Sequence, residues 1–336
     1  MYIRGLKILL WVFITLAVIL SAVWLLSFGK IYDKQNLEYG ITFSSRQAKN
    51  LELDPKELFI KILDELKVKQ LRLVAYWDEV EPENNKYNWD DLDWQINEAG
   101  ERDAKIILAI GGRLPRWPEC HYPTWTNNLK QEQKNFETLE YIKITIERYK
   151  NNKNIIAWQI ENEPFLSHFG ECPELNKKFL DKEIALARSL DSRPIVVTDS
   201  GELSLWVFAA KRADIFGTTM YRDTYSKVLK RYVHYPITPA FFRIKKNIVN
   251  LFAHPKEWIV IELQAEPWGP KQYQDLSQAE RDHTMNLDKF KEILEFSRQA
   301  GFQKFYLWGV EYWYWEKEKN NNQEIWEEAK KLFINN

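Results

Sequence analysis

The chain has 336 residues and a formal net charge of −1 at pH 7, a balance that argues against a nucleic-acid partner. Hydrophobic residues make up 45% of the sequence, which is ample for a core. Fifteen tryptophans bring the aromatic fraction to 15%. Such a surplus favours a surface that stacks on flat apolar ligand faces, although core packing is the commoner role of any single tryptophan.

The N-terminal segment, residues 1–29, is expected to lie outside the globular fold. The stretch from Ile8 to Gly29 carries no charge, and a bilayer core requires about 20 apolar residues. Arg4 and Lys7 precede it, which predicts a cytoplasmic N-terminus and an exported remainder. We therefore expect a signal anchor, a single transmembrane helix that tethers the protein to the cell membrane. A cleaved signal peptide, which would leave a secreted protein, is the alternative.

After a polar linker over residues 30–37, apolar runs alternate with helical patterns through one domain, residues 38–336. The strands are expected at 39–43, 71–75, 106–110, 155–160, 194–197, 213–217, 258–261 and 304–308. The helices are expected from 54, then at 90–100, 132–149, 173–190, 203–211, 241–251, 277–298 and 323–333. Eight such units in sequence predict an α/β fold of the (β/α)8 TIM-barrel type. An open doubly wound sheet is the alternative, but no strand is followed by GxGxxG.

Polar and aromatic side chains follow several of these strands. Because the carboxyl ends of barrel strands meet at one face, we expect these residues to lie close together. They are Arg72 and Trp77 after the second strand, Asn162 and Glu163 after the fourth, Tyr221 after the sixth, Glu262 and Trp268 after the seventh, and Trp308 at the eighth.

Two glutamates at the mouth of a barrel are the groups that general acid and nucleophilic chemistry requires. One carboxyl group must hold a proton and the other must be ionised, so their environments have to separate the two pKa values. The five histidines and two cysteines show no HxxxH or CxxC spacing, so no metal site is expected. Paired glutamates with aromatic neighbours and no metal ligands suit glycoside hydrolysis.

Three segments carry a resemblance to a known superfamily, and they occur in order at barrel spacing. Residues 158–164, Trp-Gln-Ile-Glu-Asn-Glu-Pro, resemble the Asn-Glu-Pro signature of the retaining (β/α)8 glycoside hydrolases. Residues 71–89 resemble the strand-two region of that superfamily, and residues 262–268 resemble the nucleophile segment of its β-galactosidase-like members. The likeness covers roughly residues 38–335.

The resemblance implies a role for each of these residues. Glu163 would be the general acid/base and Glu262 the nucleophile. Asn162 would bind the sugar 2-hydroxyl, Arg72 and Tyr221 would orient Glu262, and Trp308 would floor the sugar subsite, with Trp77 and Trp268 as further substrate-binding residues. The expected partner is a carbohydrate, and no cofactor is implied.

Several alternatives stay open at this point. Glu161 and Glu266 are rival carboxylates, and Asp199 is better explained as a turn or N-cap residue. Cys120 and Cys172 could form one disulfide or stay free. A carbohydrate-binding barrel without catalysis is one alternative, although a pure binder has no need of the carboxylate pair. A transglycosylase, which would use the same residues, is another.

Overall fold

The computed structural model describes residues 2–29, 31–33, 36–166, 169–172 and 176–334. Eight parallel strands close into a barrel in the order β1-β10-β9-β6-β5-β4-β3-β2. These strands are β1 (Glu38–Thr42), β2 (Gln70–Val74), β3 (Lys105–Ile110), β4 (Ile155–Ile160), β5 (Ile195–Asp199), β6 (Ile215–Met220), β9 (Glu257–Gln264) and β10 (Lys304–Trp308). The predicted (β/α)8 barrel is therefore confirmed, and every predicted strand overlaps an observed one.

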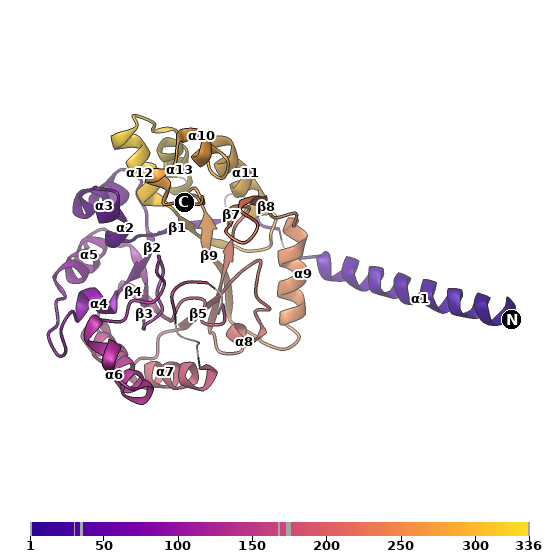
Figure 1. The fold of residues 1–336 in the computed structure, drawn as a ribbon, viewed down its shortest axis with the longest axis horizontal. Helices are drawn as coiled ribbons and strands as arrows, with labels where there is room; N and C mark the ends of the chain where they lie inside the picture. Colours follow the sequence, from indigo (N-terminus) through magenta and orange to yellow (C-terminus); the bar gives the residue numbers. More distant parts are fainter. Residues whose placement is uncertain (1, 30, 34–35, 167–168, 173–175, 335–336) are drawn as a thin grey trace.

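Helices surround this barrel, as Figure 1 shows. They are α2 (Ser45–Asn50), α3 (Pro55–Asp64), α4 (Trp77–Val80), α5 (Asp90–Glu101), α6 (Gln131–Tyr149), α7 (Lys177–Leu190), α8 (Val207–Ala210), α9 (Pro239–Val249), α10 (Gln278–Asp282), α11 (Leu287–Arg298), α12 (Val310–Lys319) and α13 (Glu324–Ile334). The helix predicted over 277–298 is two helices, because Asn286 caps a new one by accepting a hydrogen bond from Lys289.

The strands read as continuous apolar runs because both of their faces are buried. One set of side chains fills the barrel interior: Ile107, Ala157, Val196, Ile215, Ile259, Ile261 and Tyr306. Residues one position away, such as Ile106 and Leu108 on β3, belong to the larger cluster that also holds helix side chains such as Leu92 and Ile142. The interior cluster ends below the carboxyl ends of the strands, where the side chains become polar.

A short hairpin interrupts the segment between β6 and α9. It consists of β7 (Asp223–Ser226) and β8 (Arg231–His234), which pair antiparallel. The sequence pattern indicated only a long loop here. The hairpin begins directly after Tyr221 and Arg222 and therefore belongs to the rim of the barrel mouth.

Helix α1 (Tyr2–Ser27) projects away from the barrel, and its last turn lies beside α9 (Figure 1). Arg243 and Asn247 of α9 donate hydrogen bonds to the backbone oxygens of Ser27 and Leu26, at 2.8 and 2.9 Å. Over the part of the chain that the structure describes, no helix combines the length and the hydropathy that crossing a bilayer requires. The transmembrane helix predicted within residues 1–29 is therefore not confirmed.

Candidate active site

Arg72 organises the polar side chains at the carboxyl ends of the strands. It lies on β2, its side chain is fully buried, and it donates three hydrogen bonds across the barrel. Its Nε contacts Gln159 Oε1 at 2.8 Å, Nη1 contacts Glu262 Oε1 at 2.8 Å, and Nη2 contacts Asn162 Oδ1 at 2.6 Å. A planar guanidinium with donors in fixed directions thus sets the positions of residues from β4 and β9.

Glu262 is held through both of its carboxylate oxygens. Arg72 occupies Oε1, and the Tyr221 hydroxyl donates to Oε2 at 3.0 Å. Burial raises the pKa of Tyr221 well above its usual value, with the charge of Glu262 as the second cause, so this phenol keeps its proton. A positive charge and a neutral donor both stabilise a negative carboxylate at this position.

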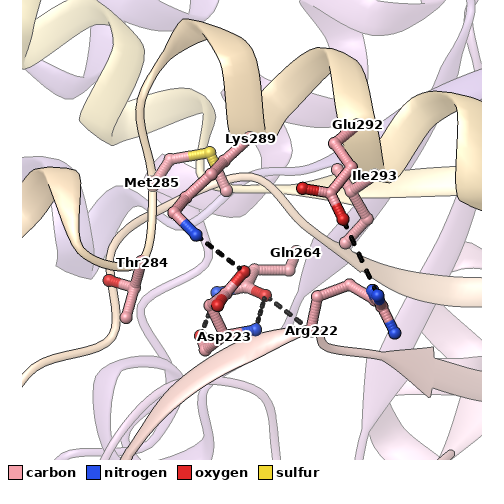
Figure 2. A pocket seen from close by; sticks show the side chains of 8 residues that line it. All are labelled: Arg222, Asp223, Gln264, Thr284, Met285, Lys289, Glu292 and Ile293. Atoms are coloured by element: carbon pink, nitrogen blue, oxygen red, sulfur yellow. Dashed lines mark hydrogen bonds and ion pairs between the residues drawn. The ribbon is translucent and has the colours of Figure 1, made fainter. Parts of the chain in front are cut away.

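The backbone after Tyr221 is fixed by the cluster shown in Figure 2. Gln264, which ends β9, accepts hydrogen bonds from the backbone N–H groups of Arg222 and Asp223 at 2.8 and 3.1 Å. Lys289 pairs with Asp223 at 3.2 Å, so α11 supports the same segment. These contacts tie the start of the β7–β8 hairpin to β9, and they keep the Tyr221 phenol beside Glu262.

Glu163 lies in a different environment from Glu262. It follows β4, is buried, and has a left-handed backbone with φ of 42°. This conformation is strained for a residue with a side chain, and such strain gathers at functional sites. The Glu163 backbone N–H donates to Thr198 Oγ1 at 2.8 Å, which anchors it to β5.

Burial raises the pKa of Glu163 well above its usual value, and the negative charges of Glu262, Glu119 and Asp199 raise it further. The protonated form of Glu163 is therefore favoured, whereas Glu262 accepts hydrogen bonds from Arg72 and Tyr221. Two neighbouring carboxyl groups in such unlike environments are the kind of arrangement that general acid and nucleophilic chemistry requires.

Asn162 brings a third carboxyl group into the site. Its Nδ2 donates to Glu119 Oε2 at 3.1 Å. Glu119 is buried in the loop after β3, and burial raises its pKa to about 8, with the charge of Glu262 as the second cause. Sequence reasoning missed Glu119, because that loop has neither periodicity nor a motif that marks one of its carboxylates.

A disulfide between Cys120 and Cys172 joins the loop after β3 to the loop after β4, with a Cα–Cα distance of 5.3 Å. The cysteines are therefore paired. Because Cys120 directly follows Glu119, this bridge also restrains the third carboxyl group. In the same region, the Glu171 backbone N–H donates to Pro118 O at 2.9 Å.

The rival carboxylate Glu161 is bound by the backbone of the loop after β3. Its two oxygens accept the backbone N–H groups of Gly112 and Arg113, at 2.8 and 2.5 Å. A side chain at Gly111 would overlap Glu161 Oε1, since an added Cβ would lie only 2.3 Å from it, and Gly111 has φ of 132°. Glu161 therefore shapes the loop after β3.

Glu183 on α7 is buried next to Glu161, and neither of its oxygens has a donor among the described residues. It is stable there when protonated, because it can then donate to Glu161. Burial raises the pKa of Glu183 well above 4.5, and the charge of Glu161 is the second cause.

The wild type is expected to lose folding stability as pH rises, and Glu183→Gln is expected to reduce this loss. The pKa of Glu183 is raised in the folded state. Its contribution to the free energy of unfolding is therefore complete below about pH 4.5 and is lost as pH rises through the folded-state pKa. In this range the wild type should lose up to about 1.4 kcal/mol more per pH unit than the variant, because glutamine donates without titrating. Urea unfolding between pH 4 and 9 measures how the free energy of unfolding of each protein changes with pH. The same slope for the wild type and the variant would contradict the expectation.

Glu266, the second rival, is engaged in a buried ion-pair cluster. Its Oε1 accepts from Arg116 at 2.5 Å and from Trp308 Nε1 at 2.7 Å. Arg116 also pairs with Glu311 at 2.6 Å and lies over the Trp308 ring, 4.1 Å from its centre. One face of Trp308 is thus covered by a guanidinium, and Glu266 serves to hold that arrangement.

The two remaining predicted substrate-binding residues have different positions. Trp268 contacts Tyr221 edge-on, with ring centres 5.2 Å apart, and so belongs to the site. Trp77 does not join it. Its ring is fully buried, stacks on Tyr141 of α6 at 5.2 Å and donates to Glu81 at 2.7 Å. The prediction for Trp77 is corrected: it is a core residue between α4 and α6.

Comparisons with known proteins find similarity to glycoside hydrolases. Residues 40–204 match the family model Cellulase (glycosyl hydrolase family 5). Beta-galactosidase BgaA of Clostridium cellulovorans is 26% identical over 166 residues, which cover 44% of this chain and 25% of BgaA. Beta-galactosidase LacZ of Lactobacillus acidophilus is 28% identical over 104 residues, 26% of this chain and 16% of LacZ. The matches thus span a quarter or less of these relatives.

Solved structures show the same fold. The beta-galactosidase from Rahnella sp. R3 aligns with a TM-score of 0.59 at 12% identity and covers 89% of this chain and 55% of that one. Native xylanase 10B from Thermotoga maritima aligns with a TM-score of 0.55 at 15% identity, covering 82% and 83%. At these identities the likeness concerns the barrel and not the substrate.

Proposed function

We propose that this chain, which belongs to the superfamily of (β/α)8-barrel glycoside hydrolases, is a retaining glycosidase in which Glu163 is the acid/base and Glu262 the nucleophile. The observation that carries the proposal is the contrast between the two carboxyl groups. Glu262 accepts from Arg72 and Tyr221, whereas burial and neighbouring negative charges raise the pKa of Glu163.

The reaction proceeds in two displacements. In the first, the Glu262 carboxylate attacks the anomeric carbon while Glu163 protonates the departing glycosidic oxygen, so the carbon–oxygen bond to the leaving group breaks as the ester to Glu262 forms. In the second, Glu163 takes a proton from water, and the hydroxide attacks the anomeric carbon and releases Glu262. Both residues end in their starting protonation states.

The scaffold supports this chemistry through fixed donors. Arg72 and Tyr221 aim the Glu262 carboxylate, so little reorganisation is needed in the transition state. Asn162, held by Arg72, is assigned to the sugar 2-hydroxyl by the resemblance of its segment to the Asn-Glu-Pro signature.

Proton NMR of the anomeric signal during hydrolysis of an aryl glycoside tests the mechanism. A retaining enzyme releases first the sugar with the configuration of the substrate, since two inversions cancel; initial release of the opposite anomer would overturn the proposal. A non-catalytic carbohydrate-binding barrel would release neither, and a transglycosylase would transfer the sugar to an added acceptor.

Aromatic rings leading outward from the catalytic pair favour an oligo- or polysaccharide substrate. Tyr221 contacts Trp268, Trp268 contacts Phe169 at 5.7 Å, and Phe169 contacts Trp117 at 6.2 Å. Trp117 is 44% exposed, and Lys227 of the hairpin lies over its ring. An exposed ring such as that of Trp117 can stack on a pyranose unit.

We expect Trp117→Ala to raise KM for oligosaccharides by roughly tenfold, about the free energy of one aromatic stacking contact, with little change for aryl monoglycosides. Initial rates on a series of increasing chain length measure this difference. Phe136→Ala on α6 is the matched control, because Phe136 is also an exposed ring. Equal effects on short and long substrates would contradict the assignment of Trp117.

We also propose that the barrel functions outside the cytoplasm. The support is the Cys120–Cys172 disulfide, since disulfides form and persist in oxidising compartments and are rare in the cytosol. Thiol labelling of the protein in fractionated cells tests this location, and free thiols in the native protein would overturn it.

A further inference from the structure

Glu119 is held in one place by its surroundings. It is 5% exposed and has a left-handed backbone, with φ of 74°. Its backbone N–H donates to Arg116 O at 2.8 Å, and its carbonyl oxygen accepts from Leu114 at 2.7 Å. The next residue, Cys120, is bound to Cys172. A carboxyl group with so many backbone restraints is fixed relative to the barrel.

The contact with Asn162 has only one chemically consistent orientation. Asn162 Oδ1 accepts from Arg72 at 2.6 Å and lies 3.3 Å from the Thr198 hydroxyl. An arginine can only donate, so the amide oxygen must face it and the NH2 group must face Glu119. Glu119 therefore completes the set of partners that determines how Asn162 presents its amide.

Glu119 also acts on Glu163 through its charge. Glu262 raises the pKa of Glu119, while Arg113 and Arg72 lower it. Glu119 in turn raises the pKa of Glu163, together with Glu262 and Asp199. The three glutamates thus form one electrostatic cluster.

We propose that Glu119 is a positioning residue of this site: it holds the Asn162 amide in one orientation and acts on Glu163 through its charge. The inference rests on the proposed function, because it concerns the same reaction. As pH rises through about 8, Glu119 becomes ionised, and its charge then disfavours ionisation of Glu163. Glu119 therefore extends the pH range in which the acid is protonated.

Two substitutions separate the two roles. Glu119→Gln retains an oxygen that can accept from Asn162 but has no charge, so the alkaline limb of kcat/KM should move to lower pH while activity at the optimum stays within about tenfold. Glu119→Ala also removes the acceptor and should cost roughly ten- to hundredfold in kcat/KM, the effect of one hydrogen bond to a charged group.

Glu171→Gln is the matched control, since Glu171 is an exposed carboxylate on the loop that the same disulfide restrains. It should reproduce the wild-type profile. An unchanged alkaline limb in Glu119→Gln, or the same shift in Glu171→Gln, would overturn the inference. If Glu119→Ala fails to fold in a thermal melt, Glu119→Gln alone decides.

Carbon-13 NMR of carboxyl-labelled glutamate provides a readout that needs no turnover. The titration of Glu163, assigned with Glu163→Gln, should shift to lower pH in Glu119→Gln. A wild type that hydrolyses no glycoside defeats the proposed function but leaves this titration as the test of Glu119. A titration unaffected by Glu119→Gln in an active enzyme defeats the inference alone.

Discussion

Glu262→Gln is expected to lower kcat on every glycoside by at least roughly 10⁴-fold. Removing the nucleophile of an enzyme alone lowers kcat about as much as removing all of its catalytic residues together. Glutamine has the size of glutamate and can still accept from Arg72, so the barrel should fold normally. What is lost is the negative charge that attacks the anomeric carbon. Initial rates with an activated aryl glycoside measure the loss, and a thermal melt monitors the fold.

The matched control for this variant is Glu311→Gln. Glu311 is also a buried carboxylate paired with an arginine, Arg116, at 2.6 Å, but it contacts Ser44 rather than the catalytic pair. It should lose stability, because Arg116 then has a poorer partner, and retain turnover. If Glu262→Gln retains more than a few per cent of wild-type activity, Glu262 is not the nucleophile. Glu266 would then be the next carboxylate to test.

The barrel itself was predictable because its strands have a simple signal. Strands buried on both faces give apolar runs such as 106–110 and 155–160, and turn residues or polar residues end each run. The number of strand–helix units, eight, then predicts that the sheet closes into a barrel. Once the strands are counted, Arg72, Glu163 and Glu262 must meet at the barrel mouth, which is why a site spread over the chain could be assembled from sequence.

The features that sequence reasoning missed depend on tertiary contacts. Trp77 follows β2 closely enough to suggest the mouth, but residues 77–80 form the short helix α4, and this turn directs the indole onto Tyr141. A helix of one turn has no periodicity to detect. Glu119 is placed by a disulfide and by backbone hydrogen bonds within an irregular loop, neither of which leaves a pattern in the residues.

The choice between rival carboxylates also required coordinates. Glu161 and Glu163 are two positions apart, so an extended strand would direct them to the same side. Both instead have left-handed backbones, with φ of 57° and 42°. The chain has already left the strand there, and the two carboxyl groups have different neighbours: Glu161 accepts from Gly112 and Arg113, whereas Glu163 is within range of the charge of Glu262.

Replacement of Glu163 should produce a different kinetic signature from replacement of Glu262. Glu163→Gln removes the proton donor but leaves the nucleophile, so natural glycosides should lose roughly 10²–10⁴ in kcat. Aryl glycosides whose leaving groups need no proton should retain their glycosylation rate. A series of leaving groups of increasing acidity measures this, because the variant should approach the wild type only at the acidic end.

Azide provides the complementary test. With Glu163→Gln and a good leaving group, the covalent intermediate accumulates because no base activates water, and azide needs no such base. Added azide should therefore restore turnover and yield a glycosyl azide with the configuration of the substrate, which NMR identifies. Glu262→Gln should gain nothing from a better leaving group, since its missing group is the one that attacks.

Full activity of Glu163→Gln on a natural glycoside would instead assign the proton to another carboxyl group, and Glu119, buried beside Asn162, would be the first to examine.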